Sequence, residues 1–177
     1  SGIQDQNHDW TQLGIPINDH SRLAFADING DGYPDAVMHS LFPNPLSGIP
    51  FEHLVFSNRG DGTFANTSDA SGLRQIQAGF FAFADIDNDG DQDVFAGLDY
   101  PLSGQTHHIL LNDGQGSFSI KADSGVESLE AGIANATFAD LNLDGISDLF
   151  LGFGGSMFQQ KDMLMLGRGD GTFMDAS

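Results

Sequence analysis

The 177-residue chain contains no cysteine and little positive charge, with 6 Lys and Arg against 25 Asp and Glu. Without cysteine it has no disulfide or thiol chemistry. The formal net charge of −19 argues against nucleic acid and anionic membranes as partners, because both require basic patches. Hydrophobic runs long enough to span a bilayer are absent, so we expect no membrane insertion. Fingerprints of serine hydrolases, zinc proteases, P-loop proteins and dinucleotide enzymes are missing too.

The acidic residues are concentrated in three nine-residue loops, which hold 11 of the 22 aspartates. The second loop, 85–93, has oxygen-bearing side chains at positions 1, 3, 5 and 9 and glycine at position 6. Alternate residues of a tight loop can direct their oxygens to one centre, and the glycine allows the sharp turn. Because such carboxylates repel one another without a cation, the loop predicts a Ca²⁺ site, with the carbonyl of position 7 as a further ligand.

The same loop occurs at 27–35, 85–93 and 140–148, each time after a Phe-Ala pair. The sequence therefore predicts about three Ca²⁺ ions per chain. Asn replaces Asp at position 3 of the first and third loops, which removes one formal charge from each. The predicted ligands are Asp27, Asn29, Asp31, Tyr33 and Asp35; Asp85, Asp87, Asp89, Asp91 and Asp93; and Asp140, Asn142, Asp144, Ile146 and Asp148.

Other interpretations of these loops are less consistent with the sequence. Asp, Asn and Gly are common in ordinary β-turns, but three copies in register favour a metal. An EF-hand requires an acidic residue at position 12 and flanking helices, whereas position 12 is Met38, Ala96 or Leu151 within apolar runs. A catalytic ion requires an open coordination position and a nearby base. No base recurs beside the loops, so we expect structural ions and no enzymatic activity.

The loops lie in three units, each with four short apolar runs bounded by turn residues and without a helical period. We therefore expect an all-β chain. A four-stranded meander that is apolar on both faces and repeated in tandem is typical of a β-propeller blade. The predicted strands lie near 21–26, 35–40, 53–58 and 63–66; near 79–84, 93–97, 107–112 and 117–120; and near 134–139, 148–152, 162–167 and 172–175.

The unit resembles the FG-GAP or VCBS repeat, known from integrin α-subunit propellers. The matching patterns are Phe-Ala-Asp-x-Asp-x-Asp-Gly-x-x-Asp-Val at 83–94 and Asn-Asp-Gly-x-Gly-x-Phe at 112–118, with equivalents in the other copies. The resemblance implies a β-propeller segment of about three four-stranded antiparallel blades, with Ca²⁺ in the hairpin between the first two strands of each. The expected blades are 21–75, 76–131 and 132–177, and residues 1–20 would be the tail of a preceding or incomplete blade.

Three blades are fewer than the four to eight that normally close a propeller. The end blades would then expose apolar faces of the kind found at interfaces. We therefore expect either a homo-oligomer or a chain that is part of a longer propeller.

The connections between the second and third strands are the most irregular parts of each unit, at 41–52, 98–106 and 153–161. Loops on a rigid scaffold often carry function, so they could form a binding face. The simpler interpretation is that their aromatic residues only shield blade edges. These aromatics are Phe42, Phe51, Tyr100 and Phe158.

Two further motifs have structural explanations. Residues 59–61 and 168–170 spell Arg-Gly-Asp, an adhesion tripeptide, but both lie where a tight turn requires Gly and Asp. His53, His107 and His108 begin third strands, where a transition metal could bind, although strand capping or a place on the top face is simpler.

We expect a calcium-binding extracellular module for protein binding or adhesion, with no catalysis of its own. Loops of this type fill more readily at the calcium levels found outside cells. The alternatives are a lectin-like, carbohydrate-binding propeller and a non-catalytic portion of a secreted hydrolase or lyase, enzymes that such repeats often accompany. The repeats do not identify the protein or glycan ligand.

Overall fold

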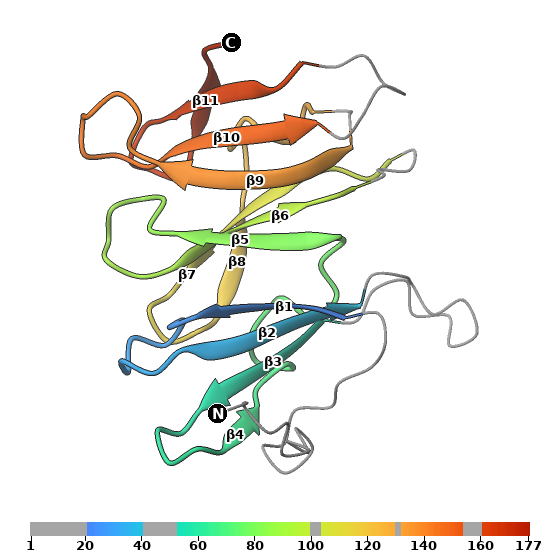
Figure 1. Cartoon of the computed structure of the whole chain (residues 1–177), viewed down its shortest axis with the longest axis vertical. Helices are drawn as coiled ribbons and strands as arrows, with labels where there is room; N and C mark the ends of the chain where they lie inside the picture. Colours follow the sequence, from blue (N-terminus) through green and yellow to red (C-terminus); the bar gives the residue numbers. More distant parts are fainter. Residues whose placement is uncertain (1–20, 41–52, 100–103, 130–131, 154–160) are drawn as a thin grey trace, which may run out of the picture.

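The computed structural model describes residues 21–40, 53–99, 104–129, 132–153 and 161–177. Within these ranges it contains twelve strands and no helix, and therefore no helix long and apolar enough to span a bilayer. The strands form three four-stranded antiparallel sheets, each in sequential order. This arrangement confirms the predicted all-β class with three four-stranded blades (Figure 1).

Every strand begins within one residue of its predicted position. Blade 1 comprises β1 (Ser21–Ala26), β2 (Asp35–Ser40), β3 (His53–Asn58) and β4 (Phe64–Asn66). Blade 2 comprises β5 (Phe80–Ala84), β6 (Asp93–Gly97), β7 (His108–Asn112) and β8 (Phe118–Lys121). Blade 3 comprises β9 (Ile133–Ala139), β10 (Asp148–Phe153), β11 (Met163–Gly167) and β12 (Phe173–Asp175).

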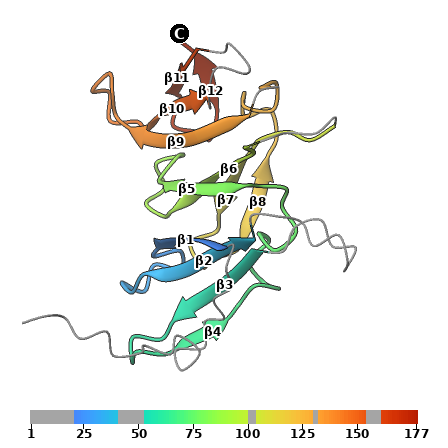
Figure 2. The same ribbon diagram turned by 45° about the vertical axis from the view of Figure 1, so that its right-hand side comes forward.

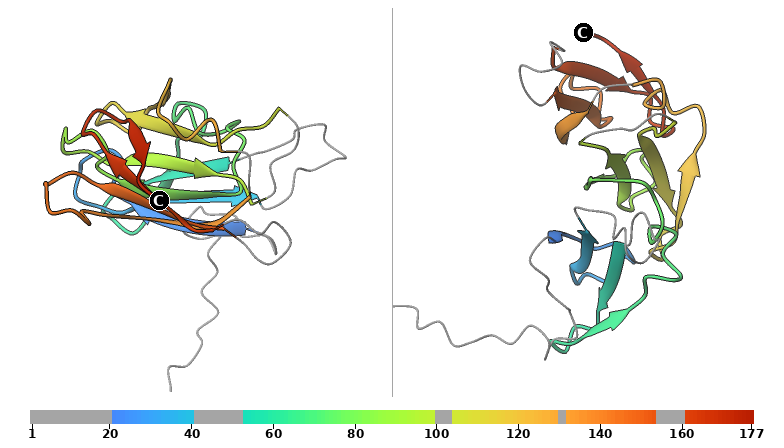
Figure 3. Two further views of the ribbon diagram at one scale, coloured as in Figure 1. Left: turned by 90° about the horizontal axis from the view of Figure 1, so that it is seen from above. Right: turned by 90° about the vertical axis from the view of Figure 1, so that its right-hand side faces the viewer.

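The blades stack face to face in the order of the sequence (Figure 2). The first strands β1, β5 and β9 are neighbours. The fourth strands lie on the convex side of the resulting arc (Figure 3). We call the face of a blade toward its predecessor the front and the face toward its successor the back.

Blade 2 is apolar on both faces because both are covered. Val94 and Leu110 on its front pack with Val37 and Val55 from the back of blade 1. Phe95 and Ile109 on its back pack with residues from the front of blade 3, which are Leu149, Leu151, Met165 and Phe173. Every residue of β6 is buried, as expected for a strand covered on both sides.

The segments that join the blades pack against the fourth strand of the next blade. The Phe118 N–H donates to the carbonyl of Ser71, and the Phe173 N–H donates to the carbonyl of Ser124, both at 2.8 Å. Gly72, which follows Ser71, has φ +74°, and a Cβ there would collide with the carbonyl oxygen of Phe118. Glycine is therefore required at this position.

Two of the expectations fall largely outside the described residues. These are the role of residues 1–20 and the binding face formed by the connections at 41–52, 98–106 and 153–161.

Candidate metal centre

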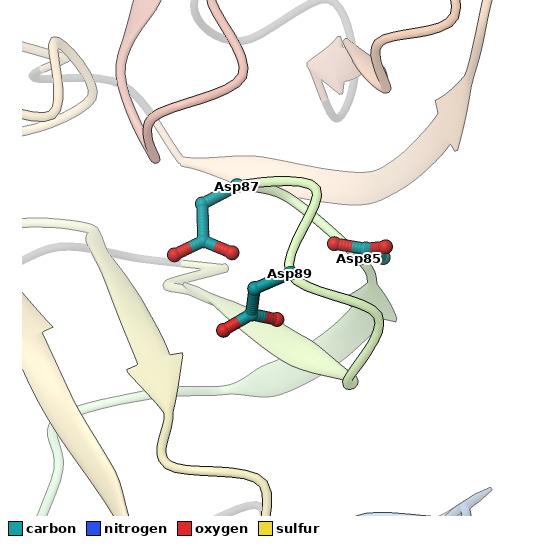
Figure 4. Close-up of side chains that lie close together, drawn as sticks. All are labelled: Asp85, Asp87 and Asp89. Carbon is teal, nitrogen blue, oxygen red and sulfur yellow. The ribbon is translucent and has the colours of Figure 1, made fainter.

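The loop between β5 and β6 brings three of its predicted ligands together. One carboxylate oxygen each from Asp85, Asp87 and Asp89 lies within 4.8 Å of the others. Figure 4 shows the three carboxylates grouped around one loop. The turn depends on Asn88 and Gly90, which have φ values of 65° and 96°. Ca²⁺ binds oxygens at about 2.3–2.6 Å, so ligands on opposite sides of one ion lie about 5 Å apart, which matches this grouping.

Several oxygens of this loop fit a bound cation because they have no other partner. Asp85 Oδ1, Asp87 Oδ1 and Asp91 Oδ1 are buried and accept no hydrogen bond within the described part of the chain. A buried oxygen without a donor carries a desolvation cost that a cation would remove. Burial, reinforced by Asp89, also raises the pKa of Asp87 above its ordinary value.

Asp91, at position 7, was expected to contribute only its carbonyl, but its side chain also belongs to this acidic group. Burial, followed by repulsion from Asp89, raises the pKa of Asp91 to about 6. The other loops have Tyr33 and Ile146 at this position. The second loop is therefore the most acidic of the three.

The first and third loops have the same backbone arrangement with less charge. In the first, Asp27 accepts hydrogen bonds from the N–H groups of Asp31 and Gly32 at 3.1 and 2.8 Å. The Asn29 amide also donates to Asp31 at 3.0 Å. The third loop repeats these bonds through Asp140, Asn142 and Asp144. In both, the asparagine amide at position 3 offsets repulsion that the second loop leaves uncompensated.

The aspartate at position 9 connects each loop to the rest of its blade. Asp93 is fully buried and accepts hydrogen bonds from the N–H groups of Ile86 at 2.9 Å and Asn112 at 2.8 Å. Asp35 and Asp148 accept the equivalent pairs of bonds. Burial raises the pKa of Asp93 to about 6, although the two backbone donors oppose that shift. Each carboxylate oxygen of Asp93 thus accepts one backbone hydrogen bond that fixes the loop. The role of Asp93 as a metal ligand remains a prediction.

Asn112 links neighbouring loops in a way that the sequence did not predict. Its Nδ2 donates to the Ile28 carbonyl in the loop of blade 1 at 2.8 Å and to the Gln92 carbonyl in its own loop at 3.0 Å. Its Oδ1 accepts from the Gly116 N–H at 3.1 Å. The only sign of this linking role in the sequence is that asparagine recurs at the equivalent position of blade 1, Asn58. Asparagine is also common in ordinary turns, so Asn58 and Asn112 could not be distinguished from turn formers.

The Arg-Gly-Asp turns are held by their own hydrogen bonds. Asp61 Oδ1 accepts from the N–H and the hydroxyl of Thr63 at 2.9 and 2.6 Å. These bonds lower the pKa of Asp61. Asp170 makes the same pair of bonds with Thr172. Turn formation is sufficient to explain both aspartates.

The histidines lie deeper than expected. His53 and His107 are fully buried, so they do not line an exposed top face. His53 lies opposite His39 on the neighbouring strand, and both rings contact Phe81 edge to face. Burial lowers the pKa of His39 and of His53 to about 4, so both are neutral at pH 7. Within the described residues, no histidine belongs to a group of three or more potential metal ligands.

Comparison with known proteins supports the repeat and the fold. Residues 53–96, from β3 to β6, match the FG-GAP-like repeat, and this range includes the second acidic loop. A solved lectin from Agrocybe aegerita, which recognises non-reducing terminal N-acetylglucosamine, is similar with a TM-score of 0.54 and 25% identity. The similarity covers 88% of this chain and 37% of that lectin, so the chain spans little more than a third of the length of the lectin. No curated protein matches the chain.

Proposed function

We propose that this chain, which carries an FG-GAP-like repeat and propeller-type blades, is a Ca²⁺-stabilised carbohydrate-binding module without catalysis of its own. Its expected setting is extracellular, where calcium is abundant. The proposal depends most on the group formed by Asp85, Asp87 and Asp89, whose oxygens are spaced as ligands of one ion.

The proposed ion has a structural role. It would neutralise the carboxylates in the loop that joins β5 to β6 and so hold the two ends of that hairpin together. Position 9 connects the same loop to β7, because Asp93 accepts the N–H of Asn112 at 2.8 Å. An ion in the loop would therefore stabilise three strands of the blade, and we expect the same arrangement in blades 1 and 3.

The lectin is the observation that favours a glycan over a protein ligand. At 25% identity over 88% of this chain, the similarity extends across all three blades. Because one fold can carry many functions, the ligand class is a proposal and not a consequence of the architecture.

A glycan array in excess Ca²⁺ tests the ligand class. We expect binding to glycans that end in non-reducing N-acetylglucosamine and no binding to the same glycans capped by another sugar. Calorimetric titration with Ca²⁺ alone tests the metal separately, with Asp89→Ala as the variant and Asp113→Ala, in the turn between β7 and β8, as the matched control. Calcium binding without any glycan binding would leave the metal proposal standing and contradict the carbohydrate proposal.

Protein binding or adhesion is the second candidate. Arg59 and Asp61 are exposed at the tip of the turn between β3 and β4, which favours an adhesion role. A cell-attachment assay with Asp61→Asn tests this role, because the amide keeps an oxygen to accept the bonds from Thr63 while removing the charge. Equal cell attachment to the wild type and to the Asp61→Asn variant would contradict an adhesion role for this turn.

A further inference from the structure

The first acidic loop contains the pair Asn29-Gly30, and Asn-Gly occurs nowhere else in the chain. In this pair the backbone nitrogen of the glycine can approach the side-chain carbon of the asparagine without hindrance, because glycine has no Cβ. Asn29 is half-buried and Gly30 is exposed, so the pair lies within reach of water. The loop therefore carries a reactive asparagine at position 3, where the second loop has Asp87.

The structure leaves the Gly30 nitrogen available for reaction. Gly30 has φ +69°, which glycine adopts readily, and among the described residues none accepts a hydrogen bond from its N–H. The Asn29 side chain is held more firmly, since its Oδ1 accepts from the Asp31 N–H and its Nδ2 donates to the Asp31 carboxylate, both at 3.0 Å. Both contacts are exposed, and they must open before Cγ of Asn29 can turn toward the nitrogen.

The third loop provides an internal comparison. Asn142 makes the same two bonds with Asp144, at 2.9 and 2.8 Å, and Leu143 follows it with φ 63°. The backbone is therefore alike in the two loops, and the residue after the asparagine differs. Asn142 is the more exposed of the two asparagines. Exposure alone would make Asn142 the more reactive, whereas the missing Cβ at Gly30 favours Asn29.

We propose that Asn29 is a site of spontaneous deamidation, with the Gly30 nitrogen as the nucleophile, and that a cation in the first loop slows the reaction. The nitrogen loses its proton and bonds to Cγ of Asn29, while the Cγ–Nδ2 bond breaks and the amide group leaves as ammonia with that proton. Water then opens the five-membered imide. Breaking the bond from nitrogen to Cγ gives aspartate, and breaking the bond from nitrogen to the main-chain carbonyl carbon gives isoaspartate. Either product carries one new negative charge.

The two products would change the loop in opposite ways. The aspartate product reproduces the carboxylates at positions 1, 3, 5 and 9 of the second loop, so we expect it to bind a cation more tightly. The isoaspartate product lengthens the backbone by one atom within the loop. Asp27 could then no longer accept the N–H groups of Asp31 and Gly32 in their present positions, at 3.1 and 2.8 Å. We expect this product to lose the cation.

Control by a cation rests on the Ca²⁺ site proposed above, whereas the modification site itself does not. Asn29 is a predicted ligand of the first loop through its side-chain oxygen. An ion bound to that oxygen would fix the side chain, so Cγ could not turn toward the Gly30 nitrogen until the ion leaves. The rate of deamidation should then follow the empty fraction of the loop. It should fall roughly a hundredfold when Ca²⁺ is at about 100 times its dissociation constant.

The test follows Asn29 and Asn142 by peptide mass spectrometry in the same samples of the full chain. The chain is incubated in excess Ca²⁺ or in EDTA, at a mildly alkaline pH that favours the deprotonated nitrogen and at a temperature where circular dichroism shows it folded. Deamidation raises the mass of a peptide by about 1 Da. Gly30→Ala and Leu143→Gly exchange the residues that follow the two asparagines. Leu143 is 88% exposed, so its replacement leaves the packing unchanged.

In EDTA we expect Asn29 to convert at least roughly tenfold faster than Asn142. Gly30→Ala should remove this difference, and Leu143→Gly should raise the rate at Asn142 to that at Asn29. Equal rates for the two asparagines of the wild type would overturn the proposal. No conversion of Asn29, under conditions where a synthetic peptide of residues 25–35 converts, would overturn it too. Equal rates at Asn29 in Ca²⁺ and in EDTA would contradict an ion in the first loop and the control by a cation, and would leave the modification site in place.

Discussion

Replacing Asn112 with alanine should weaken the connection between blades 1 and 2. The change removes the donors to the carbonyls of Ile28 and Gln92, at 2.8 and 3.0 Å, and the acceptor for the Gly116 N–H. A typical hydrogen bond contributes about 1 kcal/mol net, and a buried group left without a partner costs about 1–3 kcal/mol. Because Asn112 is buried, we expect the free energy of unfolding to fall by about 2–4 kcal/mol.

Asn58 provides the matched control, because it occupies the same place at the end of the third strand of blade 1. Its amide donates to the Pro34 carbonyl at 3.1 Å and its Oδ1 accepts from the Gly60 N–H at 3.0 Å, and both contacts are exposed and lie within blade 1. Asn58→Ala should therefore cost no more than about 1 kcal/mol. Urea unfolding in saturating Ca²⁺ measures both variants. Equal losses in the free energy of unfolding for the two variants would refute the reasoning. They would mean that the hydrogen bond from Asn112 to blade 1 does not stabilise the protein beyond the bonds that both asparagines make within their own blades.

Three further predictions concern the loop, the histidines and the joining segments. In Ca²⁺, Asp89→Ala should lower the melting temperature more than Asp113→Ala. In EDTA the order should reverse, because Asp89→Ala then relieves repulsion and loses one hydrogen bond, from the Asp91 N–H, whereas Asp113→Ala loses two, from the N–H groups of Gln115 and Ser117. The same order in both conditions would contradict the ligand assignment. The pKa of about 4 for His39 lies below its ordinary value of 6.5, so the native state binds fewer protons than the unfolded state between these values. The free energy of unfolding should therefore fall as the pH drops from 6.5 to 4, by about 1.4 kcal/mol per pH unit at most. Urea unfolding midpoints measured at pH 7 and at pH 4.5 should show a smaller fall for His39→Leu than for the wild type. Gly72→Ala should lower the free energy of unfolding, measured with urea, by about 2–4 kcal/mol. Gly104→Ala, where a Cβ meets no atom within 4 Å, should lower it by only about 1 kcal/mol. Similar losses for the two variants would argue against the collision with Phe118.

The strands could be predicted from the sequence because their signals are local. The Phe-Ala-Asp tripeptides mark the ends of β1, β5 and β9, and the glycine turns fix where the next strands begin. Runs that are apolar at successive positions indicate burial on both faces, as β6 confirms. The grouping of Asp85, Asp87 and Asp89 also follows from spacing within one loop.

Contacts between blades could not be predicted in the same way. Asn112 meets Ile28 only because two blades stack in a particular register, and the sequence separates these residues by 84 positions. Within blade 2, the bond from the Asn112 N–H to Asp93 likewise depends on where β7 lies relative to the loop. His53 was expected to cap a strand or to line the top face, but packing against Phe81 buries it.

The melting temperature of the chain in excess Ca²⁺ and in EDTA tests the central claim most directly, when it is measured together with the calcium content of the purified protein. The account predicts about three bound Ca²⁺ ions, one for each loop. It also predicts a higher melting temperature in Ca²⁺, since a ligand at 100 times its dissociation constant stabilises the folded state by about 2.7 kcal/mol per site. Identical melting temperatures in the two conditions, with no calcium retained, would contradict it.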